Sequence, residues 1–285
     1  MSSLSYLDSI ILGIVEGVTE YLPVSSTGHL TIAEKLLGLQ VNDPAITSFT
    51  AVIQLGAILA TLIYFWGKIK GMFLAWVGGL RDASKRDREE YSLAWAVIVG
   101  SIPVVVAALA FKSLIKGPLR SLWVVGAALI LWSVVIWAAE RYYARLHAGA
   151  RHRPERPAVT VKDGLFIGLM QCCSLVPGVS RSGSTIAAGL FRGLDRVTAT
   201  ELSFFMAIPA LVGAGLYEMK DVDTSVVGVG QLVVGTFVSF VVAYASIAWL
   251  LRFVRNNSLS FFIGWRVLVG AAVLVALGTG MMSAT

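Results

Sequence analysis

Charged side chains are scarce in this chain of 285 residues. Aspartate, glutamate, lysine and arginine make up 14% of the sequence, whereas 56% of the residues are hydrophobic. An ordinary soluble domain has about 25% charged residues, so this composition excludes that class. It predicts an integral membrane protein whose main partner is the lipid bilayer.

Cysteine is nearly absent, and the chain shows no secretory leader. Its two cysteines, Cys172 and Cys173, are adjacent, a spacing that suits neither a CxxC redox pair nor a metal site. The first 20 residues lack the basic segment of a cleavable signal peptide and include Asp8, Glu16 and Glu20. We therefore expect the cysteines to be small packing residues and no leader to be removed.

Basic residues are unevenly placed along the chain. The formal net charge of +6 would by itself suggest a nucleic-acid partner. However, lysine and arginine fall in short segments between apolar runs, which is the pattern of membrane topology signals. Nucleic acid is therefore not an expected partner.

Six segments are long enough, or nearly so, to cross a bilayer core, which needs about 20 helical residues. They are residues 45–66, 92–112, 121–140, 199–219, 226–251 and 260–282. A shorter apolar run at 71–80 is expected at the membrane interface. Residues 8–37 and 163–193 instead each contain two short apolar runs around a polar break with proline. Broken backbone inside a membrane is tolerated only beside protein or a water-filled cavity, so we predict two re-entrant helical hairpins.

The two polar breaks resemble each other. Val24–Gly28 (VSSTG) recurs as Val179–Gly183 (VSRSG), 155 positions later, and at the same shift Glu16 aligns with Gln171. The chain is therefore predicted to be an internal duplication. Each half holds one hairpin and three transmembrane helices, an odd number of crossings, so the halves should have opposite orientations. The expected fold is an all-α integral membrane protein with two inverted-topology repeats.

We divide the chain into a first repeat, residues 1–140, a basic linker, residues 141–162, and a second repeat, residues 163–285. Alternate loops differ in basic content, with 16 lysines and arginines on one side and five on the other. The basic side comprises residues 67–91, 141–162, 192–198 and 252–259. The positive-inside rule places these loops in the cytoplasm and places both termini and the mouth of the first hairpin outside.

Two carboxylates mark the first hairpin. Glu16 and Glu20 are four residues apart and hence on one face of a helix. They lie in an apolar setting, where a charged group is costly and is usually functional. The alternative is that they are neutral or are held by an arginine on a neighbouring helix.

The break after these carboxylates has the features of an anion site. Ser25, Ser26 and Thr27 precede a short helix, whose free N–H groups would point at a bound anion. His29 lies in the first turn of that helix. It is close enough to the break for proton transfer or for nucleophilic attack, although a buried histidine satisfied by a neighbour would also fit.

The second hairpin places an arginine in the corresponding break. Ser180, Arg181, Ser182 and Thr185 again open a short helix. If the halves are related by an axis in the membrane plane, the two helix starts meet near the middle of the bilayer. The planar fork of donors on arginine suits a phosphate. Alternatively, Arg181 only neutralises one of the glutamates.

These motifs resemble those of a known family. Glu16–His29 and Pro177–Thr185 are similar to the two signature motifs of the bacterial undecaprenyl-diphosphate phosphatase family, also called the bacitracin-resistance family. The resemblance covers essentially the whole chain, including Gln54. It implies removal of the terminal phosphate from a C55 isoprenoid diphosphate, which returns the monophosphate carrier to cell-wall synthesis. It also implies a bacterial inner-membrane protein whose active site opens to the periplasmic or outer face.

The motifs and the resemblance together indicate roles for particular residues. The catalytic candidates are Glu16, Glu20, Ser26, His29 and Arg181. The candidates for phosphate binding are Ser25, Thr27, Gln54, Ser180, Arg181, Ser182 and Thr185. A divalent cation, Mg²⁺ or Ca²⁺, held by Glu16 and Glu20 would help to neutralise charge, and no organic cofactor is expected.

The sequence alone does not identify the nucleophile. We expect Ser26 to attack after activation by His29 or a glutamate. Formation of a phosphohistidine at His29 and direct attack by water are the alternatives.

A transporter is the competing class of function. Inverted repeats with broken helices that meet at the midplane also occur in carriers, here of phosphate or isoprenoid phosphate lipids. Such a carrier would use the arginine and the helix starts but would not need a nucleophile beside carboxylates. Small residues in the helices fit packing within one chain or between subunits, so a homodimer also stays open.

Overall fold

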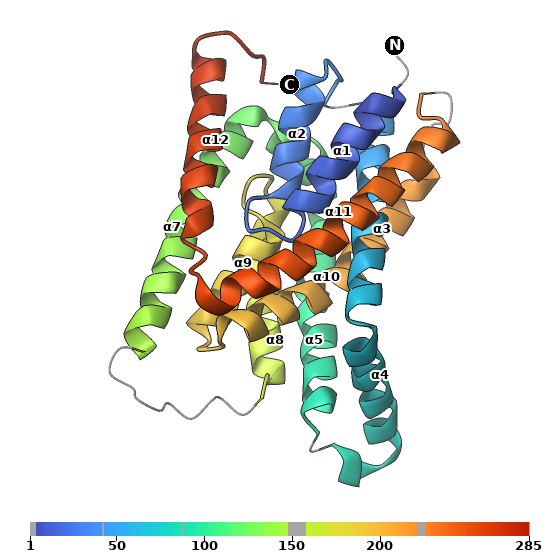
Figure 1. Ribbon diagram of the computed structural model, residues 1–285, viewed down its shortest axis with the longest axis vertical. Coiled ribbons are helices and arrows are strands. Elements are labelled where there is room, and N and C mark those ends of the chain that lie inside the picture. The colour runs from blue at the N-terminus through green and yellow to red at the C-terminus, as the bar shows by residue number, and fades with distance from the viewer. Residues whose placement is uncertain (1–3, 42, 87, 148–157, 222–225, 285) are drawn as a thin grey trace.

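The computed structural model describes residues 4–41, 43–86, 88–147, 158–221 and 226–284. Every regular element within these ranges is a helix (Figure 1). The predicted linker is described only in part, because residues 148–157 lie outside the described ranges. Residues 222–225, in a predicted outer loop, also lie outside them.

Within the described ranges, six helices are long and apolar enough to cross a membrane, as predicted. They are α3 (Pro44–Tyr64), α5 (Glu89–Ala110), α7 (Leu122–His147), α10 (Arg196–Glu218), α11 (Val229–Asn256) and α12 (Phe261–Gly278). Their ends differ from the predicted ones by up to seven residues, and at the starts of α3 and α10 a capping aspartate sets the first residue. Asp195, for example, accepts hydrogen bonds from Val197 N and Thr198 N and so starts α10 three residues early.

The two predicted hairpins are broken helices. Their four arms are α1 (Tyr6–Thr19), α2 (Ser26–Leu36), α8 (Val161–Gln171) and α9 (Arg181–Phe191). The longest arm has 14 residues and is about 21 Å long at the helical rise of about 1.5 Å per residue. No single arm can therefore cross a hydrocarbon core of about 30 Å.

The apolar run 71–80 belongs to a longer helix than expected. It lies within α4 (Trp66–Arg81), which follows α3 after Phe65 and packs beside α5 (Figure 1). Gly79 permits this contact, because a side chain there would collide with the Tyr91 ring. The remaining short helical turns are η1 (Ala83–Lys85), α6 (Lys112–Lys116), η2 (Pro118–Arg120), η3 (Cys172–Leu175) and η4 (Met219–Asp221).

The hairpins start from opposite ends of the molecule. In Figure 1, α1 begins at the upper end, near both chain termini, whereas α8 begins at the lower end, near α4 and the end of α7. An inverted duplication requires this arrangement. The predicted basic loops, where they are described, gather at the lower end.

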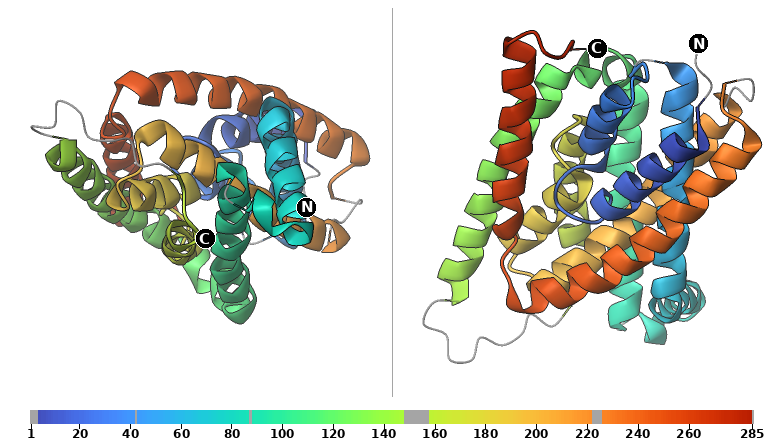
Figure 2. Two further views of the ribbon diagram at one scale, coloured as in Figure 1. Left: turned by 90° about the horizontal axis from the view of Figure 1, so that it is seen from below. Right: turned by 45° about the horizontal axis from the view of Figure 1, so that its top comes forward.

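Each hairpin packs against a helix of the other half of the chain. α1 lies along α11, and α8 lies along α5 (Figure 2). Glycines at corresponding positions of the predicted duplication allow these close approaches: a Cβ atom at Gly13 would collide with the Gly235 carbonyl, and one at Gly168 with the Gly100 carbonyl. The crossed packing brings the tips of both hairpins together in the centre of the molecule.

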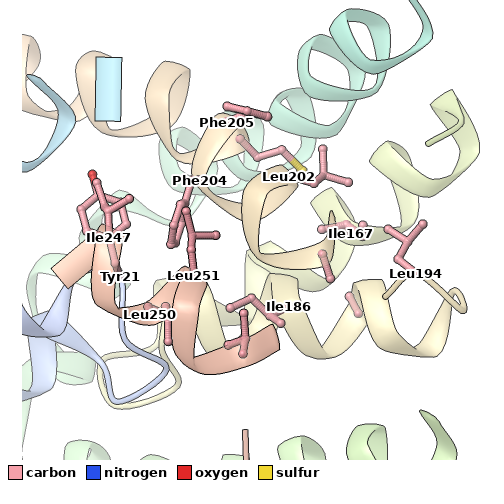
Figure 3. Close-up of a cluster of buried hydrophobic side chains, with 14 of the residues drawn as sticks. Tyr21, Ile167, Ile186, Leu194, Leu202, Phe204, Phe205, Ile247, Leu250 and Leu251 are labelled. Atoms are coloured by element: carbon pink, nitrogen blue, oxygen red, sulfur yellow. The ribbon is translucent and has the colours of Figure 1, made fainter. Parts of the chain in front are cut away.

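A buried apolar cluster supports the first tip. The Tyr21 ring packs edge-on against Phe204, with ring centroids 4.8 Å apart, and lies among side chains that include Leu251 (Figure 3). Its hydroxyl donates a hydrogen bond of 2.6 Å to the Ala57 carbonyl on α3. The tip therefore has a fixed position relative to α3 and α10.

Candidate active site

The backbone has the same conformation in both breaks. Ser25 and Ser180 have φ angles of 78° and 80°, and among the described residues they are the only non-glycine residues with positive φ. Each caps the helix that follows, since Ser25 Oγ accepts from Gly28 N (3.3 Å) and Ser180 Oγ from Gly183 N (3.0 Å). Strained backbone of this kind costs about 1–3 kcal/mol per residue and clusters at functional sites.

The two breaks contact each other. Gly178 N of the second break donates to Ser25 Oγ of the first, at 3.1 Å. Ser182 Oγ donates to the Leu22 carbonyl, at 2.9 Å. The starts of α2 and α9 therefore lie together, as expected, and both direct backbone N–H groups and positive dipole ends at one region.

A serine, a glutamate and an arginine meet at this junction. Ser26 Oγ donates a hydrogen bond of 2.5 Å to Glu20 Oε2, and Arg181 Nη2 donates one of 3.0 Å to Glu20 Oε1. Arg181 Nη1 donates to the carbonyl and hydroxyl oxygens of Ser203, at 2.9 and 3.0 Å. Glu20 and Ser26 are 4% and 8% exposed, so these contacts form in a desolvated setting where charge interactions are strong.

The arginine keeps one donor free. Arg181 Nε is buried and has no hydrogen-bond partner among the described residues, and the same holds for Gln171 Oε1. Both side chains line the cavity described next. Because buried polar atoms are almost always paired, an anion that accepts from Arg181 Nε would complete the site.

A cavity of about 480 Å³ lies over the junction. The predicted site residues that line it are Glu20, Ser25, Ser26, Thr27, Gln54, Ser180 and Arg181. The lining continues past the ends of α5 and α10, where Lys112 and Tyr217 lie. These helix ends lie towards the end of the molecule that holds both termini (Figure 1).

His29 does not line the cavity. Its Nδ1 lies 2.8 Å from the Ser25 carbonyl oxygen, and its Nε2 accepts a hydrogen bond of 2.9 Å from Trp265 Nε1 on α12. A carbonyl only accepts, so Nδ1 carries the proton and both ring nitrogens are engaged. In this arrangement Glu20, and not His29, is within reach of the Ser26 hydroxyl.

Two other predicted residues support the site from behind. Ser182 and Thr185 are fully buried and do not line the cavity. Thr185 Oγ1 donates to Ser203 Oγ at 2.6 Å, and Ser203 in turn holds Arg181. They therefore position the arginine and the tip of the first hairpin, and neither is in contact with the cavity.

Glu16 and Glu20 do not form a preformed cation site. Both oxygens of Glu20 are engaged, by Ser26 and by Arg181. Glu16 is fully buried and accepts no hydrogen bond among the described residues, but it does not line the cavity. The described part of the chain contains no group of three or more His, Cys, Asp or Glu residues arranged to hold a metal. The divalent cation stays a prediction, and no step below depends on it.

Arg266 is a central residue that sequence reasoning missed. It is fully buried on α12, and its guanidinium donates to the carbonyls of both breaks: to Pro23 O at 3.0 Å, and to Gly178 O and Val179 O at 2.9 and 3.2 Å. Nε donates to Ser133 Oγ at 3.2 Å. The sequence did contain a signal for its importance, because Arg266 is the lone arginine within a predicted transmembrane segment.

Comparison with known proteins assigns the family. The family described as bacitracin resistance protein BacA matches residues 9–272. The chain belongs to this family. The chain is also similar to undecaprenyl-diphosphatase 3 of Frankia casuarinae, which is 52% identical over 99% of this chain and 100% of the relative. Undecaprenyl-diphosphatase 1 of Streptomyces avermitilis is 50% identical and the undecaprenyl-diphosphatase of Mycolicibacterium smegmatis 46% identical, each over 99% of this chain and 100% of the relative.

Family membership confirms the resemblance seen in the two motifs. Together with the six apolar helices, it identifies the chain as a multi-pass membrane protein.

Proposed function

We propose that the chain is an undecaprenyl-diphosphate phosphatase. It hydrolyses the terminal phosphate of a C55 isoprenoid diphosphate, regenerates the monophosphate carrier for cell-wall synthesis and thereby confers bacitracin resistance. The names of relatives about 50% identical over the full chain support this assignment. The observation that carries it is the contact of Ser26 with Glu20 and of Glu20 with Arg181 at the wall of one cavity.

The geometry supports covalent catalysis by Ser26. Its Oγ attacks the terminal phosphorus, an Oγ–P bond forms, and the bond from that phosphorus to the bridging oxygen breaks. The hydroxyl proton passes to Glu20, which accepts its hydrogen bond at 2.5 Å. Glu20 passes this proton to the bridging oxygen as the lipid monophosphate leaves, and so returns to its carboxylate form. Water then attacks the phosphoserine with Glu20 as base, and the Oγ–P bond breaks. Glu20 returns the proton of the water to Ser26 Oγ, which leaves inorganic phosphate and a free Ser26 hydroxyl.

Arg181 and the two helix starts provide the positive charge. Phosphoryl transfer depends mainly on positioning and on neutralisation of charge. The free Nε donor of Arg181 is available for a phosphate oxygen, and the N-termini of α2 and α9 supply further N–H groups.

The chain is expected in the bacterial inner membrane with the cavity open to the outer face. The basic loops lie at the end of the molecule opposite both termini (Figure 1), and the positive-inside rule assigns that end to the cytoplasm. The cavity lining continues towards the other end. Substrate would therefore arrive from the outer leaflet.

Phosphate release by purified protein in detergent tests the function, because detergent leaves no second compartment for transport. We expect one inorganic phosphate per undecaprenyl diphosphate consumed, and none with Ser26→Ala. Binding of the lipid without phosphate release would contradict the enzyme and favour a carrier.

A further inference from the structure

A second charged pair lines the same cavity, away from Ser26. Arg120, at the end of η2, lies opposite Glu34 on α2, with Nη2 3.7 Å from Glu34 Oε2. Arg120 Nη1 donates a hydrogen bond of 2.5 Å to Thr47 Oγ1. All three side chains line the cavity, and those of Arg120 and Glu34 are 11% and 1% exposed.

The polar atoms of this pair lack some of their hydrogen-bond partners. Arg120 Nε and Glu34 Oε2 are buried and have no hydrogen-bond partner among the described residues. The distance of 3.7 Å between the charged groups is too long for a hydrogen bond. A buried donor and a buried acceptor of one ion pair, neither with a hydrogen-bond partner, indicate that a ligand completes the site.

The two unpaired atoms define the chemistry of that ligand. It must accept a hydrogen bond from a guanidinium and donate one to a carboxylate. Phosphate that still carries a proton does both, because its P–O⁻ oxygens accept and its P–OH group donates. Sulfate has no proton to donate, so it cannot satisfy Glu34 when that carboxyl group is ionised.

We propose that Arg120, Glu34 and Thr47 form a second phosphate site, which takes inorganic phosphate released at Ser26 on its way out of the cavity. The inference rests on the proposed phosphatase function. Glu34 follows Ser26 by eight residues on α2, a separation of about 12 Å along the helix. The two phosphorus atoms of a diphosphate share one oxygen, so a substrate held at Ser26 does not reach Arg120 with its second phosphate.

The position of the pair fits an exit site. Arg120 lies two residues before Leu122, whose N–H donates to the carbonyl of Ala284 near the C-terminus, at 3.0 Å. The pair therefore lies towards the terminal end of the molecule, between the reaction site and the proposed outer face. The lipid product keeps its chain in the bilayer, whereas free phosphate can leave through this part of the cavity.

Equilibrium dialysis of labelled orthophosphate against the purified full-length protein in detergent tests this site without turnover. We expect two phosphates bound per wild-type chain. Arg120→Gln should weaken one of them at least tenfold, the loss of about one charge-assisted hydrogen bond. Thr47→Val removes only the acceptor for Arg120 and should weaken the same site. Lys220→Gln, which removes a positive charge near Tyr217 but outside the cavity lining, should bind both phosphates normally.

Competition identifies the ligand. At about pH 8.5, where the Glu34 carboxylate is ionised and phosphate still carries one proton, excess sulfate should leave the Arg120 site occupied in the wild type and displace phosphate from it in Glu34→Gln. Unchanged binding in Arg120→Gln and Thr47→Val, or displacement by sulfate from both wild-type sites, would overturn the proposal. Displacement from the Arg120 site by farnesyl phosphate would assign the site to the lipid head group and overturn the exit role. Two phosphates bound by a chain that releases none would overturn the phosphatase function but leave this site in place.

Discussion

The two hairpin breaks share a backbone design but differ in chemistry. Ser25 and Ser180 adopt the same positive φ and cap the next helix in the same way. The residue after each serine differs, however: it is Ser26 in the first break and Arg181 in the second. The first hairpin also supplies Glu20. The two helix starts therefore have equivalent backbone geometry, but the candidate nucleophile and base lie on the first hairpin and the candidate cation on the second.

This division of roles predicts that activity is most sensitive to substitution of Glu20, the general base on the first hairpin. Glu20→Gln removes the acceptor for the Ser26 proton, and kcat should fall about 10²–10⁴-fold. The measurement is phosphate release by purified protein. Glu201→Gln, which disrupts a glutamate paired with Lys68 outside the cavity, is the matched control and should stay near wild type. A near-normal kcat for Glu20→Gln would show that another group acts as the general base.

The second break should depend on the shape of its cation as well as on its charge. Arg181 uses Nη1 for Ser203 and Nη2 for Glu20 and leaves Nε free, and a lysine ammonium cannot reproduce this fork. Arg181→Lys should therefore reduce kcat/KM about 100-fold, the cost of about two charge-assisted hydrogen bonds. The matched substitution Arg192→Lys, at the other end of α9, should have little effect. Equal kinetics for the two variants would show that Arg181 acts only as a counter-ion.

Arg266 should stabilise both breaks. It donates to carbonyls of each, and its loss leaves several buried acceptors unpaired. Arg266→Gln should lower the free energy of unfolding by about 2–4 kcal/mol and reduce activity as the tips separate. Thermal unfolding in detergent measures the first effect, and Arg252→Gln on the exposed face of α11 is the control. An unchanged melting temperature would show that Arg266 does not hold the tips together.

The smallest effect is expected at His29. Its ring nitrogens are engaged by Ser25 and Trp265 outside the cavity, so His29→Ala should reduce kcat less than about tenfold, and Trp265→Phe should behave similarly. A loss of 10²-fold or more, confined to His29→Ala, would restore the histidine as base or nucleophile.

The sequence allowed the broken helices and the meeting of Ser26 with Arg181 to be predicted, because both follow from a duplicated motif with fixed spacing. The direction of the His29 side chain was not predictable in this way. It depends on Trp265, which lies 236 positions away and has no motif of its own.

The Arg120–Glu34 pair was missed for a related reason. Glu34 lies near the end of the first hairpin and Arg120 in the predicted outer loop before α7, and neither belongs to a repeated motif. They become neighbours only in the folded chain, where Arg120 reaches Glu34 on α2 and Thr47 on α3. Contacts between distant segments are set by tertiary packing, which periodicity and hydropathy do not report.

The central claim is that the first hairpin attacks phosphorus while the second neutralises its charge. Rapid acid quenching during turnover of a substrate labelled in its terminal phosphate, followed by peptide mapping, tests this claim most directly. We expect acid-stable label on Ser26, absent in Ser26→Ala and strongly reduced in Arg181→Lys. Acid-labile label that depends on His29, or no covalent label at all while phosphate is released, would contradict it.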